Sequence, residues 1–463
     1  MLRLYDTIHG EVRDLATRDA GRLSMYVCGP TVDNLPHLGH GRFTLVWDVA
    51  RRWFTFRGLD VHFVSNITDI DDKIIARAQR EGTTESVVAT TYEDQWWAAM
   101  AAIGVARPDD VPHATQYVPE MVMLIESFLA EDIAYVISDG VYFDTSRVSD
   151  YGLLAGQALD SLRAGARIEA NEEKRSPLDF TLWKFAKPGE PRWEAPFGEG
   201  RPGWHTECVV MSLGLLGDGF DLHCGGLDLK FPHHENERAQ AVAAQRPFAQ
   251  HWGHNGWVMV GDEKMSKSLG NFTSLTDLLE GTDARAYRLL VIRSHYRSPI
   301  EVSPTTIADA ERALARLDTL ARRFDLPALA GQEMLTQSDF DFTGPSALLA
   351  QRVGALLDED LNTPLAVAEL FDAVSRANTL ADQGEVEEAR DIAMAVTVLF
   401  AALGLSVFSA VHDSDDEVRE LARARDEARR AGEWGEADRL RDEISARGWV
   451  VEDSAEGTRI RRG

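Results

Sequence analysis

Apolar positions in the first seventy residues predict a strand, a helix and a second strand. Residues 23–32 (LSMYVCGPTV) are an apolar run closed by Gly-Pro, which indicates a buried strand that ends in a loop. Residues 41–58 carry apolar side chains at helical spacing: Leu45, Val49, Trp53 and Phe56. Residues 60–69 (DVHFVSNITD) read as a second strand. This βαβ unit predicts the opening of a parallel, doubly wound sheet.

The pattern loosens between residues 108 and 203, where Pro and Gly cluster among short apolar pieces. We interpret this segment as an insertion between two halves of the sheet. Alternation then resumes, with a helix at 204–217, a strand at 219–226, a helix at 233–245 and a strand at 256–260. We expect this last strand to belong to the same sheet, so that the loop GDEKMSKSLGN, which follows it, lies at the carboxyl edge.

Beyond residue 303 the apolar period is that of a helical bundle. One helical face follows a Ser303 cap and Pro304: Ile307, Ala310, Leu314, Leu317, Ala321 and Phe324. Residues 361–377 repeat the device with Thr363 and Pro364. The last fifty residues predict a helix, a turn at Gly432, a helix ending at Gly448, and two short strands.

Taken together, the elements predict an α/β protein. We expect a Rossmann-like doubly wound parallel sheet split by an insertion, then an α-helical bundle and a small α+β C-terminal domain. A length of 463 residues suits about three domains. We predict these segments: first half of the sheet domain 1–107, insertion 108–203, second half 204–260, lysine loop and following region 261–302, helical bundle 303–405, and C-terminal domain 406–463.

Composition narrows the class of protein. No run approaches the roughly 18 apolar residues of a membrane span, and the N-terminus lacks a signal-peptide core, so we predict a cytoplasmic protein without membrane contact. The net charge of −27 disfavours generic binding of nucleic acid. Residues 417–463, however, hold 11 Arg against 12 acidic residues. A local arginine contact with phosphate is therefore allowed there, although a solvated helix surface also explains the pattern.

Two short motifs are expected at the carboxyl edge of the sheet. PHLGH, residues 36–40, stands where the first strand passes into the first helix, which is where parallel sheets hold phosphates. Gly39 admits a base or ribose to the backbone, while His37 and His40 offer N–H donors. The other motif contains Lys264 and Lys267, two of only seven lysines in the chain. A lysine is a mobile point charge that can follow a departing pyrophosphate.

A third constellation is a candidate metal site. Cys28 ends the first strand, Cys208 lies on the helix after GWHTE, and a histidine and a glutamate four residues apart share a helical face. Two thiolates with an imidazole suit zinc. The residues alone leave three alternatives open: His234 for His233, Glu235 for Glu237, and Cys224 as a third thiolate.

HLGH followed by KMSKS resembles the signature pair of class I aminoacyl-tRNA synthetases. More narrowly, CGPTV, NITDIDDKI, GWHTEC, FPHHENE, HNGWVMV, KMSKSLGN and DLNTP resemble the motifs of cysteinyl-tRNA synthetases, in order and across nearly the full length. The family has HIGH where this chain has Leu38, and mostly HGGG where it has HCGG. The second departure puts a free thiol, Cys224, close to the expected site.

The resemblance implies an ATP-dependent, AMP-forming cysteine–tRNA ligase whose partners are tRNA(Cys), L-cysteine and ATP with Mg²⁺, and which is a monomer. It assigns one Zn²⁺ to Cys28, Cys208, His233 and Glu237. It further implies that catalysis depends on His37, His40, Lys264 and Lys267. The residues implied to bind the nucleotide are Gly39, His37, His40, Lys267 and His223, and those implied to bind the amino acid are Thr68, Trp204 and Asp228. His254 and Trp257 match adenine-side contacts or packing. The helical bundle is implied to contact the tRNA stem, and the C-terminal domain to bind the anticodon.

The chemistry of the substrate gives zinc a purpose. Cysteine and serine differ by one atom, and a hydrophobic slot separates such near-isosteres by only about a hundredfold. Zinc binds a thiolate strongly, whereas a hydroxyl stays protonated, so the metal can serve as the specificity device. Two other functions remain: the mycothiol-pathway ligase, which joins cysteine to an amino-sugar inositol and lacks a full tRNA-reading tail, and a non-catalytic RNA-binding protein of synthetase type.

Overall fold

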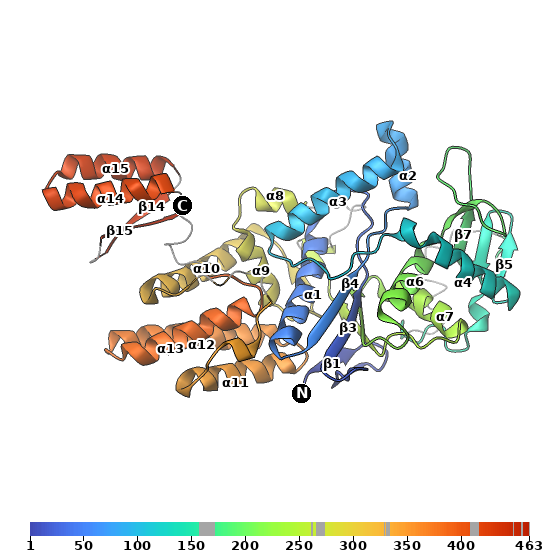
Figure 1. Ribbon diagram of the computed structural model, residues 1–463, viewed down its shortest axis with the longest axis horizontal. Coiled ribbons are helices and arrows are strands. Elements are labelled where there is room, and N and C mark those ends of the chain that lie inside the picture. Colours follow the sequence, from blue (N-terminus) through green and yellow to red (C-terminus); the bar gives the residue numbers. More distant parts are fainter. Residues whose placement is uncertain are drawn as a thin grey trace.

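The computed structural model describes residues 1–156, 172–260, 263–264, 274–327, 329, 334–407, 416–447, 449–454 and 457–462. At its centre lies a parallel sheet in the order β10-β9-β3-β4, of which Figure 1 labels β3 and β4. Its strands are β3 (Arg22–Val27), β4 (Asp60–Ser65), β9 (Leu222–Gly226) and β10 (His251–Asn255). The helix α1 (Leu38–Phe56) connects β3 to β4, so the predicted βαβ unit is confirmed.

Helix α1 buries nearly its whole length because it lies between the sheet and other helices. Leu45, Trp47 and Trp53 are fully buried, and the helix packs against β4, α3 and α9. Two more helices flank the second half of the sheet, α6 (Trp204–Leu216) before β9 and α7 (Glu235–Ala243) before β10. A π-helical turn, η3 (Lys230–His234), leads directly into α7. These helices bring chemically active side chains to the carboxyl edge of the sheet.

The segment between β4 and α6 first packs against the sheet domain and then forms a separate lobe. It begins with α2 (Asp72–Glu81) and α3 (Glu85–Ala102) and continues into an antiparallel sheet in the order β5-β6-β7-β8, which has its own apolar core. Its remaining elements are η1 (Ala114–Tyr117), α4 (Val118–Ala130), β5 (Ala134–Ile137), β6 (Gly140–Phe143), η2 (Thr145–Arg147), β7 (Phe180–Phe185) and β8 (Gly200–Pro202). In Figure 1 this antiparallel sheet lies at the end of the molecule opposite the C-terminal helices.

One sequence prediction is wrong: the strand that leads into the lysine loop does not belong to the central sheet. This strand, β11 (Val258–Val260), pairs with β12 (Glu263–Lys264) and β13 (Ile300–Glu301). The chain leaves the central sheet at Gly256, whose N–H donates to the carbonyl of Tyr296 (2.8 Å). A Cβ at Gly256 would come within 2.6 Å of two backbone carbonyl oxygens, so only glycine fits this departure.

Beyond Ser303 the chain is helical, as predicted, and two helices that the sequence pattern did not indicate, α8 and α9, precede this region. Ser303 Oγ accepts a hydrogen bond from the N–H of Thr306 (3.3 Å) and caps α10, with Pro304 in the first turn. At α12 the cap is Asn362 rather than Thr363, because the Thr363 hydroxyl donates to the carbonyl of Ser294. The elements are α8 (Leu275–Leu279), α9 (Ala284–Ile292), α10 (Pro304–Phe324), η5 (Gln337–Asp339), α11 (Gly344–Asp358), α12 (Thr363–Asp382) and α13 (Val386–Ala401).

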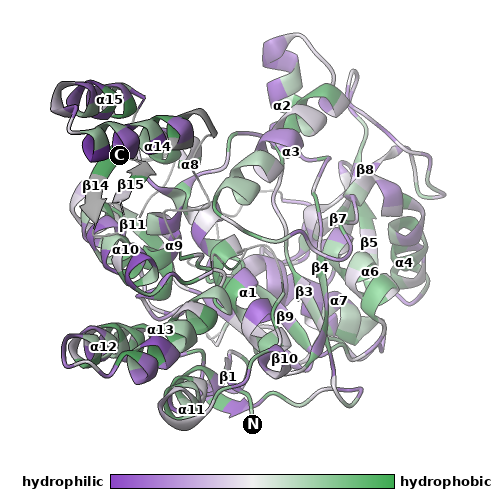
Figure 2. Cartoon of the chain, turned by 60° about the vertical axis from the view of Figure 1, so that its left-hand side comes forward, coloured by the Kyte–Doolittle hydropathy of each residue, from purple (hydrophilic) through white to green (hydrophobic). Residues whose placement is uncertain are grey.

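Both chain ends form small units. The N-terminal hairpin pairs β1 (Arg3–Asp6) with β2 (Glu11–Asp14). The C-terminal unit comprises α14 (Asp416–Ala431), α15 (Trp434–Ala446), β14 (Trp449–Ser454) and β15 (Gly457–Arg462), with Gly432 at φ +77° between the helices. Hydrophilic residues cover much of α14 and α15 (Figure 2). Among the described helices, none has the length and apolarity that a membrane crossing requires.

Candidate active site

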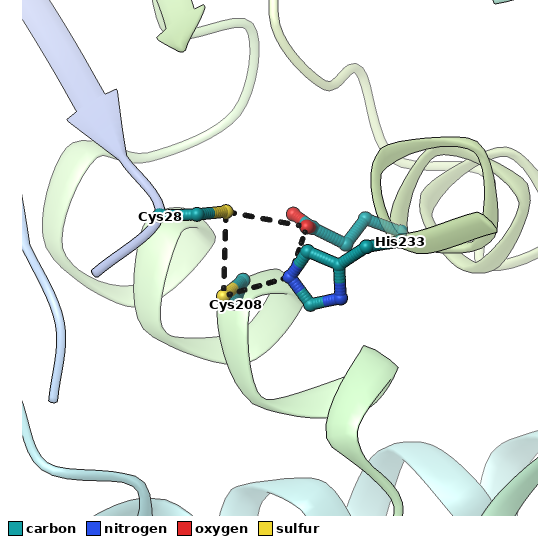
Figure 3. Close-up of side chains that lie close together, drawn as sticks. Cys28, Cys208 and His233 are labelled. Carbon is teal, nitrogen blue, oxygen red and sulfur yellow. Dashed lines mark hydrogen bonds and ion pairs between the residues drawn. The ribbon is translucent and has the colours of Figure 1, made fainter. Parts of the chain in front are cut away.

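Cys28, Cys208, His233 and Glu237, which we call the thiol cluster, come together at the carboxyl edge of the sheet and are all buried. The Sγ atoms of the two cysteines lie 3.7 Å apart, and Cys28 Sγ lies 3.4 Å from Glu237 Oε1. His233 Nε2 closes the ring, 3.6 Å from Cys208 Sγ and 2.9 Å from Glu237 Oε1. Figure 3 shows Cys28, Cys208 and His233 pointing toward a common centre.

The geometry of this ring fits a tetrahedral metal ion. All four ligand atoms lie within 4.8 Å of one another. Zinc bonds of 2.0–2.3 Å in a tetrahedron separate neighbouring ligands by about 3.3–3.8 Å, and three of the four edges fall in or at this range. The second nitrogen of His233 is also engaged, because Nδ1 lies 3.0 Å from Nδ1 of His205. Metal-binding histidines are usually oriented by such a partner.

Electrostatics separates the two thiols. Burial raises the pKa of Cys28 well above its ordinary value, and the neighbouring Cys208 adds to this. Burial acts in the same direction on Cys208, but the hydrogen bond from Cys28 and the adjacent His233 lower the pKa of Cys208 to about 6. Burial opposes ionisation of Glu237, yet His233 and His223 hold its pKa well below the ordinary value. Cys208 and Glu237 thus favour their anionic forms. Burial opposes protonation of His233, but these two neighbours raise the pKa of His233 to about 10.

The alternatives left open by the sequence have other hydrogen-bond partners or other surroundings, although His234 also lies near Cys28 and Glu237. His234 Nδ1 lies 2.9 Å from His254 Nε2, and Glu235 accepts from the N–H of Ala155 (2.9 Å). A second group of donors, Cys28, His223, His234 and Glu237, is also close enough to hold a metal, but it offers one thiol instead of two. Cys224 belongs to neither group. The two-thiol set is the better match to zinc.

One turn of α6 contributes three functional side chains. Trp204, Glu207 and Cys208 stand three and four residues apart, so they share one helical face. The Trp204 ring stacks on His233 with 4.1 Å between ring centroids. Glu207 Oε2 accepts a hydrogen bond from Thr68 Oγ1 (2.7 Å), and both side chains are buried. Burial and the neighbouring Cys208 raise the pKa of Glu207 well above its ordinary value.

The HLGH motif forms the N-terminus of α1. His37 is the N-cap, and its Nδ1 accepts from the N–H of His40 (3.2 Å), while His40 Nδ1 accepts from the N–H of His37 (3.4 Å). The two rings stack at 3.6 Å. Because Nδ1 accepts in each neutral ring, the proton lies on Nε2 and each histidine presents a donor. Gly39 follows in the first helical turn.

The other predicted residues lie near the carboxyl edge of the sheet or outside the residues that the structure describes. His223 is fully buried and its Nε2 lies 2.8 Å from Glu237 Oε2, whereas Asp228 is exposed in the loop after β9. The backbone of Lys264 pairs with Met259, and Lys267 lies outside the described residues. Sequence reasoning missed His205 and Glu207. Both occur in GWHTEC, and the helical spacing from Trp204 to Glu207 was the available signal.

Comparison with known proteins identifies the family. A model of the class I (C) tRNA synthetase catalytic domain matches residues 15–312, a DALR domain matches 352–408, and a cysteinyl-tRNA ligase anticodon-binding domain matches 411–461. The chain belongs to the cysteine–tRNA ligase family. Proteins named cysteine–tRNA ligase from Laribacter hongkongensis and Chromobacterium violaceum are 42% and 43% identical, each covering 100% of both chains.

The predicted fold class is confirmed by solved structures of other class I synthetases. Methionyl-tRNA synthetase of Mycobacterium tuberculosis in complex with methionyl-adenylate superimposes with a TM-score of 0.58 over 82% of this chain and 90% of that chain, at 17% identity. At this identity the likeness speaks for the fold alone. For this cysteine–tRNA ligase family member, the anticodon-binding match at residues 411–461 disfavours the mycothiol-pathway alternative, whose members lack such a tail.

Proposed function

We propose that the chain is a cysteine–tRNA ligase. It joins L-cysteine to ATP, forming cysteinyl-adenylate and pyrophosphate, and passes the cysteinyl group to the terminal ribose of tRNA(Cys), releasing AMP. The observation that carries this proposal is the thiol cluster, whose Cys28 follows the carboxyl end of β3, the strand that leads into the HLGH helix. Full-length similarity to proteins named cysteine–tRNA ligase supports the same activity.

Selection of cysteine is assigned to the thiol cluster and its neighbours. Cys28, Cys208, His233 and Glu237 would hold one Zn²⁺ per chain, which when bound favours a thiolate over a hydroxyl. Trp204, stacked on His233, and Thr68 would line the pocket for the amino acid. Asp228, exposed after β9, would hold the substrate ammonium or a ribose hydroxyl.

Activation of ATP is assigned to the two signature motifs. The Nε2–H groups of His37 and His40 would donate to phosphate oxygens, supported by the positive N-terminus of α1, and Gly39 leaves room for the nucleotide. Lys264 and Lys267 would stabilise the departing pyrophosphate, which carries Mg²⁺. His223 is assigned to the nucleotide side. Little covalent chemistry falls to the protein, because positioning and charge stabilisation suffice.

Binding of tRNA is assigned to the second half of the chain. The helical bundle would contact the acceptor stem, and α14, α15 and their hairpin would bind the anticodon. The arginine content of residues 417–463 supports this, because this segment is nearly neutral on an otherwise acidic chain. We further propose that the protein acts as a monomer in the cytoplasm.

The first experiment supplies labelled cysteine, ATP and zinc to the purified protein with total tRNA in one tube and glucosaminyl-inositol in another. The proposal requires label on tRNA, and label on the sugar alone would overturn it. Labelled serine is the matched substrate control and should give at least about 10⁴-fold less product. A protein of synthetase type that only binds RNA would label neither acceptor.

A second experiment tests the lysine loop. Lys267→Ala should slow cysteine-dependent exchange of pyrophosphate into ATP by at least about 100-fold, while the KM for cysteine changes little, because the lysine acts on charge that develops during the reaction. Lys187→Ala, an exposed lysine in the insertion, is the matched control and should leave the rate unchanged. An effect of Lys267→Ala confined to the KM for cysteine would contradict the assignment.

A further inference from the structure

Glu207 is a buried carboxyl that none of the roles assigned above uses. Its relative exposure is 1%, and its Oε2 atom accepts the hydroxyl proton of Thr68 at 2.7 Å. We propose that Glu207 is a positioning residue that fixes the Thr68 side chain in the amino-acid pocket and so sets the affinity for cysteine. This inference rests on the proposed function, because it assigns a residue to the same site.

The position of Glu207 on its helix supports this role. Helix α6 presents Trp204 and Cys208 to the site from the same face, one against His233 and the other against Cys28. Glu207 lies between them in sequence and reaches a different neighbour, the segment after β4. A single helical turn therefore holds the aromatic wall, one thiol and the support of Thr68 in a fixed spatial relation.

Thr68 is held from a second side by Asn66. The amide Nδ2 of Asn66 donates to Thr68 Oγ1 (3.4 Å), and its Oδ1 accepts from the N–H of Gly29 (2.8 Å) and from Cys208 Sγ (3.7 Å). Gly29 follows Cys28 directly, so this network joins both thiol segments to Thr68. A Cβ at Gly29 would lie 1.6 Å from the carbonyl oxygen of Asn66, which shows how closely the two segments approach.

Removal of Glu207 should release Thr68 rather than dismantle the cluster. The Thr68 backbone is fixed independently, because its N–H donates to the carbonyl of Pro30 (3.0 Å) and its carbonyl accepts from Val32. The Thr68 hydroxyl, in contrast, would lose its short hydrogen bond to a carboxyl oxygen. Without this acceptor, threonine gains access to other rotamers, which place its methyl group where the hydroxyl was.

The experiment compares Glu207→Ala with Glu207→Gln in cysteine-dependent pyrophosphate exchange. Glu207→Ala should raise the KM for cysteine about tenfold, the effect of one lost hydrogen bond in a buried site. The KM for ATP should change by less than about twofold, and zinc content should stay at that of the wild type. Glu207→Gln retains an acceptor oxygen for Thr68 and should stay within about threefold of the wild type.

A double-mutant cycle with Thr68→Val tests whether Glu207 acts through Thr68. Thr68→Val should raise the KM for cysteine as Glu207→Ala does, and adding Glu207→Ala to it should change the KM by less than about twofold. An unchanged KM in Thr68→Val, or independent effects that multiply, would overturn the inference. If Glu207→Ala folds poorly, Thr68→Val alone and Glu207→Gln still test the inference: an unchanged KM in the first, or a change well beyond about threefold in the second, overturns it. Absence of exchange in the wild type would instead reject the proposed function.

Discussion

Two buried polar clusters in this molecule have opposite designs. The first is the thiol cluster, in which two thiols, a carboxylate and one imidazole face one another. The second, the Asp48 triad, consists of Asp48, Arg52 and Arg288 at the contact between α1 and α9. Both clusters are buried, so burial alone does not distinguish a functional site from an ion-pair cluster that stabilises the fold.

The two clusters differ in the charges of the groups that face one another. In the Asp48 triad, Oδ2 of Asp48 accepts from Arg52 and Arg288, each at 2.8 Å, and Oδ1 accepts from the N–H of Ala106. Arg288 also donates to the carbonyls of Ile103 and Leu403, which ties the sheet domain to the end of α13. Protein groups thus accept hydrogen bonds from both guanidinium groups and donate hydrogen bonds to the carboxylate. The thiol cluster instead crowds acidic groups together, an arrangement that a bound cation stabilises.

The largest effect on stability should follow from removing the negative charge of the Asp48 triad. Asp48→Asn keeps the shape of the side chain but leaves two buried guanidinium groups without their counter-ion. We expect a loss of about 3–5 kcal/mol in the free energy of unfolding. Urea unfolding followed by circular dichroism measures it. The matched control is Asp60→Asn, an exposed partner of Arg22, which should cause no measurable change. Similar stability of both variants would show that the Asp48 triad does not stabilise the fold.

Loss of a thiol should instead weaken metal binding. Cys208→Ser replaces a thiolate with a hydroxyl that stays protonated, so we expect zinc affinity to fall by at least about 100-fold and activity to fall with it. The free energy of unfolding of the metal-free protein should change by less than about 1 kcal/mol. Competition with a chelating dye measures the first quantity and urea unfolding the second. Unaltered zinc affinity would remove Cys208 from the ligand set.

The sequence predicted the regular, buried helices better than the way in which the chain enters and leaves the central sheet. Strong periodicity identified α1 and, together with the Ser303 cap, α10, because local signals and burial agree there. Strand β10 (HWGHN) escaped notice, since histidines and a glycine give it neither alternation nor an apolar run. The misplacement of β11 has a different cause. A turn at Gly256 depends on carbonyl groups forty residues away, and no local pattern records such a contact.

The site shows a similar limit. Spacing alone could not choose between His233 and His234, because the π-helical turn that contains them shifts their angular positions relative to α7. Both are buried, one in the thiol cluster and the other against His254. Family resemblance selected His233, while the fold was needed to bring Glu207 and His205 into contact with Thr68 and His233. Such contacts join segments that are distant in sequence.

Acidification should reduce the contribution of the Asp48 triad to the free energy of unfolding. Burial opposes ionisation of Asp48, but Arg288 and Arg52 lower its pKa below the ordinary value of 3.8. A depressed pKa contributes stability that is complete above the unfolded value and is lost as pH falls through the folded one. The stability difference between the wild type and Asp48→Asn should therefore hold from about pH 7 to pH 5 and narrow below about pH 4. Unfolding curves across this range measure it, and a constant difference would contradict the assignment.

The smallest effect is expected at the third cysteine, which is a matched control for the thiol cluster. Cys224 is as buried as Cys28 and Cys208, but it belongs to neither group of possible metal ligands, and its Sγ and the Trp47 ring both lie close to where a Cβ of Gly253 would be. Cys224→Ala removes one packed sulfur atom and should lower the free energy of unfolding by about 1 kcal/mol. Zinc affinity and the discrimination between cysteine and serine should equal those of the wild type, because the atoms of the thiol cluster are untouched. If zinc affinity fell as in Cys208→Ser, Cys224 would have to be counted among the ligands, and the contrast between a reactive cluster and inert buried thiols would fail at this residue.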